Sequence, residues 1–347
     1  MTDTRMNGRL TVRDFKTDQD VRWCPGCGDY AILAALQGFL PELGIPRERI
    51  VFISGIGCSS RFPYYLNTYG MHSIHGRAPA IATGLSVSRP DLSVWVVTGD
   101  GDALSIGGNH LIHALRRNVN IKILLFNNQI YGLTKGQYSP TSKLGKVTKS
   151  TPAGSIDTPF NPISLALGAE ATFVARTIDS DRKHLQSVLR AAAAHNGSAF
   201  VEIYQNCNIF NDGAFDLLKD PESRDDALIR LENGRRVTFG KQGEWAVTHP
   251  SGGFGLSVVP TASLRPEEIL THDEAVEDPA YAFALSRLPG SDLRNTPIGV
   301  FRSVPRPSYD ELLRDQIAAA RPKDTDTRSQ EQELATMLTS GDTWIIE

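Results

Sequence analysis

The chain carries five short runs of apolar residues in which β-branched side chains are common. They cover Ile50–Ile53, Ser93–Thr98, Ile121–Phe126, Ala171–Ala175 and Ala199–Tyr204. Short runs that are apolar at consecutive positions are typical of strands buried on both faces. Because spacers of helical length separate these runs, we expect parallel strands joined by crossover connections.

The spacers carry apolar residues at helical spacing. The segments expected to be helices are Asp29–Phe39, Ala78–Val87, Gly107–Arg117, Pro162–Leu167 and Arg182–His195. In the third of them, Leu111 and Leu115 share one face. Arg116 and Arg117 end it, where cations interact favourably with the helix dipole. Alternating strands and helices predict an α/β fold with a doubly wound, mostly parallel sheet.

The pattern changes in the last third of the chain, from Phe210 to Glu347, where proline and charged residues become more frequent. Arg236–Phe239 and Gly299–Phe301 look like isolated strands, Ser308–Ala320 is expected to be a helix, and the very polar Arg321–Gln332 a mobile linker. We therefore expect an N-terminal arm at residues 1–21, a core domain at 22–209, and a C-terminal extension at 210–347 that packs on the core or on another subunit.

Composition is that of an ordinary globular protein. Of the 347 residues, 40% are hydrophobic and 22% charged, and the formal net charge is −3. With no run of basic residues, this balance gives no electrostatic reason to expect nucleic acid as a partner. The apolar runs are too short to cross a bilayer, and residues 1–21 lack the apolar core of a secretory signal. We expect a cytoplasmic protein that does not bind a membrane.

Polar motifs follow two consecutive apolar runs. Gly99, Asp100, Gly101 and Asp102 follow the second run, and the pair Asn127–Asn128 follows the third. Ligands of open α/β sheets bind at the carboxyl ends of strands, so both motifs fall where a cofactor would bind. A carboxylate, an amide oxygen, a backbone carbonyl and phosphate oxygens suit Mg²⁺, and the glycines let the backbone approach a diphosphate. The two motifs together predict a thiamine diphosphate (TPP) and Mg²⁺ site.

Two other interpretations of these motifs are weaker. A dinucleotide-binding fingerprint would have a third glycine, and an acidic residue would end the next strand to bind a ribose; both are missing here. Each motif alone is also typical of an ordinary turn after a strand. The presence of both motifs, each at the end of an apolar strand, argues against two unrelated turns.

Four cysteines, Cys24, Cys27, Cys58 and Cys207, lie in three segments at the predicted ends of strands or helices. They are few for a disulfide scaffold in a chain without an export signal. Four thiolates are the usual ligands of a [4Fe–4S] cluster. A structural zinc site usually pairs two short Cys or Cys/His motifs, and only one CxxC is present. On the cysteines alone, zinc and four unrelated buried thiols both stay open.

Five motifs in combination resemble the β subunit of 2-oxoacid:ferredoxin oxidoreductases, most closely the 2-oxoglutarate (KorB-type) branch. They are WCPGCG at 23–28, GIGCS at 55–59, HGRAPA at 75–80, GDGD at 99–102 and YGLTKGQ at 131–137. The resemblance is strong over residues 22–208 and looser beyond, where HDE at 272–274 and GVFR at 299–302 are similar to the family.

The resemblance implies ligands for three cofactors. The expected Mg²⁺ ligands are Asp100, Asn128 and the backbone carbonyl of Ile130. The residues expected to border the diphosphate of TPP are Gly99, Gly101 and Asp102. The expected ligands of one [4Fe–4S] cluster are Cys24, Cys27, Cys58 and Cys207.

The resemblance also implies a reaction and partners. A 2-oxoacid, CoA and oxidised ferredoxin would give acyl-CoA, CO₂ and reduced ferredoxin. We expect 2-oxoglutarate as substrate, while pyruvate, branched-chain and aryl 2-oxoacids stay open. The Glu that activates TPP belongs to a pyrimidine-binding domain, so an α subunit would supply it together with the CoA site, in an (αβ)₂ assembly. This chain alone would then be inactive. A non-catalytic, zinc-bound structural subunit is the alternative from another class.

Residues near the motifs are further candidates. Arg61 would bind the substrate carboxylate through its guanidinium fork, or be an ordinary surface arginine. His75 and Arg77 would touch the cofactor, or only begin a helix. The residues that could line the substrate pocket are Lys135, Gln137 and Ser139. Those expected to pack or face solvent without taking part in chemistry are His110, His113, Trp23 and Tyr131.

Overall fold

The computed structural model of this chain describes residues 10–250, 253, 255–290, 292–320, 330–342 and 344. These residues form two compact units, one that ends at Asp310 and one that begins at Glu311. The larger unit is built on a sheet with helices on both faces, and the described part of the smaller unit is mainly helical.

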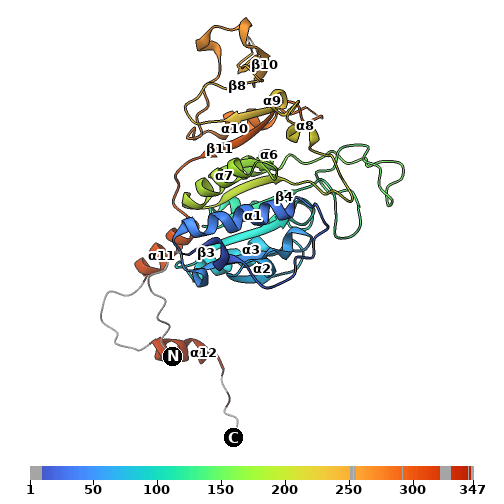
Figure 1. Cartoon of the computed structure of the whole chain (residues 1–347). Coiled ribbons are helices and arrows are strands. Elements are labelled where there is room, and N and C mark those ends of the chain that lie inside the picture. The colour runs from blue at the N-terminus through green and yellow to red at the C-terminus, as the bar shows by residue number, and fades with distance from the viewer. Residues whose placement is uncertain are drawn as a thin grey trace. The chain divides into compact units, whose positions relative to one another are not determined.

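An eight-stranded sheet organises the larger unit (Figure 1), with the strand order β2-β1-β3-β4-β6-β5-β11-β7. The strands are β1 Ile50–Ser54, β2 Tyr69–His72, β3 Ser93–Gly99, β4 Lys122–Asn127, β5 Phe173–Ile178, β6 Ala199–Tyr204, β7 Leu228–Leu231 and β11 Thr296–Ser303. Neighbouring strands are parallel at every pairing except the one between β11 and β5. The expected doubly wound, mostly parallel sheet is confirmed.

The five strands predicted from apolar runs are β1, β3, β4, β5 and β6. Side chains of β3 alternate between the two faces of the sheet, so that Val94 and Val96 join one hydrophobic cluster and Trp95 and Val97 join the other. Because both faces are covered, consecutive positions must be apolar, and this is why these strands could be recognised in the sequence.

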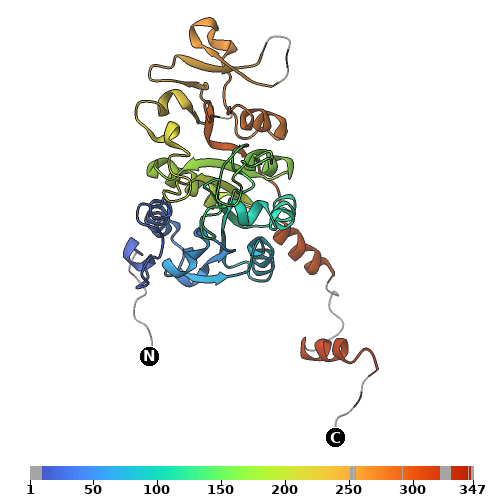
Figure 2. The ribbon, with the colours of Figure 1, turned by 90° about the vertical axis from the view of Figure 1, so that its right-hand side faces the viewer.

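Helices cover the sheet on both faces. One layer consists of α1 Asp29–Phe39 and α7 Arg182–Ala194; the other includes α3 Ala78–Ser88, α5 Gly108–Arg116, α6 Pro162–Gly168 and α10 Pro279–Ser286. Figure 2 shows α1 and α3 on opposite sides of the strands. The predicted helices are confirmed to within a residue or two at their ends. Shorter helices are α2 Phe62–Tyr65, α4 Asp100–Leu104, α8 Asp216–Lys219 and α9 Arg224–Ala227.

One expectation for the C-terminal part is wrong. Gly299–Phe301 is not an isolated strand, because it lies within β11, which pairs with β5 on one side and with β7 on the other. The apolar pattern of β11 is interrupted by Pro297 and Gly299, two residues that weaken a strand signal. The C-terminal part therefore contributes two strands to the main sheet.

A second, antiparallel sheet has the order β10-β9-β8. Its strands are β8 Thr238–Phe239, β9 Trp245–Thr248 and β10 Ser257–Pro260. The strand expected at Arg236–Phe239 is also not isolated: it is the shorter β8, which pairs with β9 at the edge of this small sheet. Short 3₁₀ helices cover Val12–Phe15, Leu40–Leu43, Arg47–Arg49, Ser59–Arg61, Thr261–Ser263 and Pro266–Glu268.

Two helices lie at the C-terminal end of the described chain, α11 Tyr309–Ala320 and α12 Gln330–Leu338. The first confirms the helix expected at Ser308–Ala320. Most of the expected linker, residues 321–329, lies outside the described residues, and its last three residues belong to α12. Over the part of the chain that the structure describes, no helix is both long and apolar enough to cross a membrane.

Candidate functional site

The two polar motifs meet at one edge of the sheet, because β3 and β4 are adjacent and parallel, with Gly99 opposite Phe126. Asp100 begins α4 directly after β3, and Asn127 is the last residue of β4. Thr141 joins the two motifs, since its hydroxyl lies 2.6 Å from Oδ2 of Asp100 and 2.9 Å from Oδ1 of Asn127. The structure therefore brings the predicted motifs into one hydrogen-bonded group.

Asp100 is held by hydroxyl donors and has no cationic partner among these contacts. Its Oδ2 accepts hydrogen bonds from Ser139 at 2.5 Å and from Thr141 at 2.6 Å. Burial raises the pKa of Asp100 to about 6, and the two hydroxyl donors oppose that rise. A carboxylate that is 2% exposed and held only by neutral donors suits a hard cation, which would stabilise its charged form.

Asn128 and Ile130 lie in the turn that follows β4. Oδ1 of Asn128 accepts the backbone N–H of Ile130 at 3.2 Å, and the backbone carbonyl of Asn128 accepts a hydrogen bond from Asn211. Asp100, Asn128 and Ile130 all line one cavity. The three residues expected to bind Mg²⁺ thus line the same cavity.

Asp102, on α4, links the loop of Gly76 to the end of β3. Its Oδ1 accepts the N–H of Gly76 at 2.9 Å, and its Oδ2 accepts the hydroxyl of Thr98 at 2.8 Å. A Cβ on Gly55 would stand 1.8 Å from Oδ2 of Asp102, so only glycine admits the carboxylate there. His75 lies 3.3 Å from Oδ1 and lines the cavity together with Asp102.

Arg77 and Tyr131 lie differently with respect to this cavity. Arg77 directly precedes α3, and its guanidinium is 3.5 Å from the backbone carbonyls of His75 and Ile106, which suits a role at the start of the helix. Tyr131 lines the cavity, and its hydroxyl donates to the carbonyl of Gly101 at 3.0 Å. Tyr131 is therefore part of the site, where sequence reasoning had expected only packing.

The three cysteine-bearing segments converge beside this cavity. A Cβ on Gly132 would lie 3.6 Å from the sulfur of Cys58 and 3.5 Å from that of Cys207. The sulfur of Cys27 lies 3.2 Å from Nε2 of Gln205. Cys58 and Gly132 also line the cavity that contains Asp100 and Asn128. We call the four cysteines (Cys24, Cys27, Cys58 and Cys207) the cysteine centre, and the edge of the sheet at Asp100 and Asn128 the diphosphate edge. Residues of both line the same cavity.

Burial favours the protonated thiols of Cys27 and Cys58 by raising the pKa of each. It raises the pKa of Cys58 to about 12, to which the charges of Asp29, Cys207 and Cys24 add. The pKa of Cys27 is raised above the usual thiol range, again mainly by burial. Metal coordination deprotonates thiols, so closely spaced half-buried thiols fit a metal-binding centre.

All four candidate ligands are thiols. Four thiolates are the usual ligands of a [4Fe–4S] cluster and also occur around structural zinc. In the described ranges, no three His, Cys, Asp or Glu side chains are placed to share a single metal ion. The donor set therefore fits a thiolate-bound metal centre.

The remaining candidates lie around these two centres. Arg61 ends the 3₁₀ helix after Cys58, where its charge favours the Cys58 thiolate. Trp23 is a core residue, as expected, and its indole N–H donates to the carbonyl of Cys58 at 2.7 Å. Ser139 binds Asp100, as described above, while Lys135 is exposed and Gln137 half-buried in the following loop. His110 and His113 lie on α5.

A buried ion pair between Glu202 and Arg176 binds the side-chain amide of Asn127. Glu202 on β6 is fully buried; its Oε1 accepts the Asn127 amide at 2.7 Å and its Oε2 accepts Nε of Arg176 at 2.7 Å. Sequence reasoning missed Glu202, Arg176 and Thr141. A charged residue inside the apolar run of β6 was the one available signal, because charges are rarely buried without a partner.

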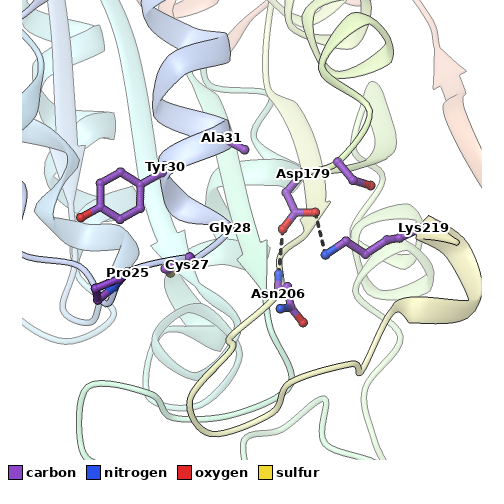
Figure 3. A pocket seen from close by; sticks show the side chains of 10 residues that line it. Pro25, Cys27, Gly28, Tyr30, Ala31, Asp179, Asn206 and Lys219 are labelled. Carbon is purple, nitrogen blue, oxygen red and sulfur yellow. Dashed lines mark hydrogen bonds and ion pairs between the residues drawn. The ribbon is translucent and has the colours of Figure 1, made fainter.

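A second pocket opens on the outer side of the cysteine centre (Figure 3). Pro25, Cys27, Gly28 and Tyr30 line it on one side, and Asp179, Asn206 and Lys219 on the other. Asp29 begins α1 two residues after Cys27 and lines the first cavity. Burial raises the pKa of Asp29 to about 7. One cysteine, Cys27, thus lines this pocket, and another, Cys58, lines the first cavity.

Known proteins are similar to this chain in sequence and in fold. Residues 55–203 match the thiamine pyrophosphate enzyme C-terminal TPP-binding domain. The chain is 63% identical over 335 residues to the 2-oxoglutarate oxidoreductase subunit KorB of Mycobacterium tuberculosis, covering 96% of this chain and 88% of that protein. It is 37% identical to the 2-oxoacid:ferredoxin oxidoreductase 1 subunit beta of Aeropyrum pernix, covering 81% of this chain and 92% of the relative.

A solved structure is similar over almost the whole chain. It is a 2-oxoglutarate:ferredoxin oxidoreductase from Magnetococcus marinus with 2-oxoglutarate, coenzyme A and succinyl-CoA bound; the TM-score is 0.73 at 33% identity. The similarity covers 96% of this chain and 97% of that one. The chain therefore belongs to the 2-oxoacid:ferredoxin oxidoreductase family, as a β subunit with a TPP-binding domain.

Proposed function

We propose that this β subunit, together with an α subunit, catalyses the oxidative decarboxylation of 2-oxoglutarate with CoA and passes the electrons through one [4Fe–4S] cluster to ferredoxin. One observation carries the proposal. Asp100 and Asn128, the expected Mg²⁺ ligands, line the same cavity as Cys58 and Gly132 of the cysteine centre. A redox cluster in that position would adjoin the place where the substrate is decarboxylated.

The diphosphate edge would hold TPP through Mg²⁺. Asp100, Asn128 and the carbonyl of Ile130 would be the protein ligands, and Gly99 and Gly101 would let the backbone approach the diphosphate. Asp102 would keep the loop of His75 and Gly76 against this edge. When bound, TPP supplies the nucleophile for the 2-oxo carbon and the electron sink for the loss of CO₂.

The cysteine centre would hold the cluster through Cys24, Cys27, Cys58 and Cys207. Three of the four thiols are half-buried, and Cys24 is exposed. The exposed position of Cys24 suits an electron exit toward a protein acceptor, and the cavity side of Cys58 suits entry from the TPP site. The relatives named as 2-oxoacid:ferredoxin oxidoreductase subunits favour the cluster over the alternative of a zinc-bound structural subunit.

Substrate and partners rest on the relatives. The 63% identical protein is named a 2-oxoglutarate oxidoreductase subunit, and the structure at 33% identity holds 2-oxoglutarate, coenzyme A and succinyl-CoA. The α subunit would contribute the pyrimidine-side Glu and the CoA site in an (αβ)₂ assembly. Pyruvate, branched-chain and aryl 2-oxoacids are the alternative substrates.

Arg61 is proposed to bind the distal or 2-oxo carboxylate of the substrate. Loss of a charged hydrogen bond costs about 1.5–3 kcal/mol, so Arg61→Ala should raise KM for 2-oxoglutarate about 10- to 100-fold. Arg22→Ala, an exposed arginine beside the CxxC segment, is the matched control. An unchanged KM in Arg61→Ala would remove Arg61 from the substrate site.

The proposed function is tested on the protein co-purified with its α subunit under anaerobic conditions. Iron and sulfide analysis should give one four-iron cluster per chain with broad absorption near 400 nm, and CoA-dependent dye reduction should be fastest with 2-oxoglutarate. Cys58→Ser should lose iron, and Asp100→Asn should retain iron but lose TPP. A colourless protein that contains zinc would overturn the proposal, and preference for another 2-oxoacid would overturn the substrate.

A further inference from the structure

Asp179 is a buried carboxylate in the pocket that Cys27 lines. It directly follows β5 and is 4% exposed. Its Oδ2 accepts the backbone N–H of Asn206 at 2.8 Å, and its Oδ1 lies 3.5 Å from Nζ of Lys219 on α8 (Figure 3). None of the family motifs contains either residue.

The carboxylate lies where two cysteine-bearing segments meet. Asn206 precedes Cys207, and Gly28 follows Cys27. The N–H of Gly28 donates to the carbonyl of Asn206 at 3.1 Å. A Cβ on Gly28 would stand 2.0 Å from Oδ2 of Asp179, so the absence of a side chain there is what allows the carboxylate to pack against the CxxC segment.

Gln205 adds a second link between the same segments. Its Nε2 lies 3.2 Å from the sulfur of Cys27 and 2.7 Å from the carbonyl of Asn206. Asp179 therefore anchors the Cys207 segment through the N–H of Asn206, and Gln205 and Gly28 connect that segment to Cys27. Displacement of the carboxylate would remove the anchor at Asn206 and leave only these other links.

Asp179 and Lys219 also place two opposite charges beside the cysteine centre. Asp179 and Cys27 line the same pocket, as does Lys219, whose side chain is 23% exposed. Reduction of an iron–sulfur cluster adds one negative charge to it. A neighbouring anion opposes that charge and a neighbouring cation favours it, and potentials of such clusters respond to nearby charge.

We propose that Asp179 and Lys219 form a positioning pair for the cysteine centre: the Asp179 carboxylate holds the segments of Cys27 and Cys207 together, and the two charges set the reduction potential of the cluster. Asp179 lowers that potential and Lys219 raises it. This inference rests on the proposed cluster at the four cysteines. Neither residue is among those that line the cavity of Asp100 and Asn128.

Three variants, each studied in the complex with the α subunit, separate the positioning role of Asp179 from the effect of the two charges on the potential. Asp179→Asn keeps an oxygen acceptor for the N–H of Asn206 and removes the charge, so it should retain iron and shift the midpoint potential upward. Lys219→Met should shift the potential downward. Asp179→Ala removes both charge and acceptor, so it should bind less iron and lose it faster in air. Anaerobic titration by electron paramagnetic resonance gives the potentials.

Asp181→Ala is the matched control, two residues further along the chain. Asp181 caps α7 by accepting the N–H of His184 at 3.1 Å and pairs with Arg230 at 2.8 Å, away from the cysteine segments. The control should lower thermal stability while its iron content and potential stay at the wild-type values.

Two results would refute the inference. Potentials of Asp179→Asn and Lys219→Met that equal the wild-type value, or that shift in the same direction, would remove the electrostatic role. Wild-type iron retention in Asp179→Ala would remove the positioning role. A wild-type complex without iron would instead overturn the proposed function itself, so the two failures are distinguishable.

Discussion

Gly132 offers a direct test of where the cluster lies. Gly132→Ala adds one methyl group between the sulfurs of Cys58 and Cys207, at 3.6 and 3.5 Å, which is ordinary van der Waals contact in the metal-free protein. The backbone of Gly132 is outside the left-handed region, so alanine fits it without strain. The substitution therefore changes the space between two sulfurs and little else.

Gly132→Ala should stabilise the metal-free protein and weaken retention of the cluster. In the metal-free protein, Gly→Ala at a compatible backbone stabilises by about 0.4–1 kcal/mol, because the unfolded chain loses freedom. With metal, the methyl group occupies space that the cluster needs. Overpacking by one methyl costs about 1–3 kcal/mol, which corresponds to about 5- to 150-fold weaker retention of the cluster.

The assay compares iron per chain, absorption near 400 nm and the melting temperature of the metal-free protein. Gly84→Ala is the control, since Gly84 lies inside α3 with open space around its Cβ; it should raise the melting temperature and leave iron unchanged. If Gly132→Ala binds iron as tightly as the wild type, with the same spectrum, the cluster does not lie between Cys58 and Cys207.

Three further changes test other parts of the structure. Thr141→Val removes a hydroxyl donor of Asp100 and should weaken Mg²⁺-dependent TPP binding about 10- to 100-fold by calorimetry, while Thr141→Ser should restore it; equal affinities would refute the contact. Glu202→Gln leaves the Arg176 guanidinium unpaired and should cost about 3–5 kcal/mol of unfolding free energy in urea; a loss below about 1 kcal/mol would contradict a buried pair. Burial, aided by Arg230, lowers the pKa of His184 to about 4. Between pH 6.5 and pH 4 the unfolded chain therefore binds a proton at His184, whereas the folded protein does not. Stability should therefore be full above pH 6.5 and fall toward pH 4 by on the order of 1–3 kcal/mol from His184. His184→Gln should reduce this fall and leave the part due to His195, whose pKa burial also lowers to about 4, whereas exposed His249→Gln should leave the fall unchanged.

The buried strands and the pairing of the two polar motifs could be predicted, because they depend on the apolar pattern and on local motifs. Buried parallel strands such as β3 must be apolar at consecutive positions, and residues at the carboxyl ends of adjacent strands must be close, which is why Asp100 and Asn128 could be paired in advance. β2 was missed because it is an edge strand whose four residues are all exposed. An edge strand needs no apolar run.

The rest depends on contacts between distant segments. Ser139 and Thr141 reach Asp100 from a loop without periodicity. Ser139 was expected only to line the substrate pocket, and Thr141 was missed. Asp102 was expected only to border the diphosphate, yet its oxygens hold Thr98 and the N–H of Gly76. Asp179 reaches the cysteine segments because β5 and β6 are neighbours in the sheet, which only the strand order discloses.

The place of β11 has a consequence for synthesis of the chain. β11 spans Thr296–Ser303 and lies between β5 and β7. Until the ribosome has released it, the free edge of β5 exposes unpaired N–H and C=O groups, which readily pair with other chains. Pairing partners so distant in sequence also form late and slowly. A product truncated before β11 would therefore keep every cysteine and both cofactor motifs and still lack an interior strand of its sheet.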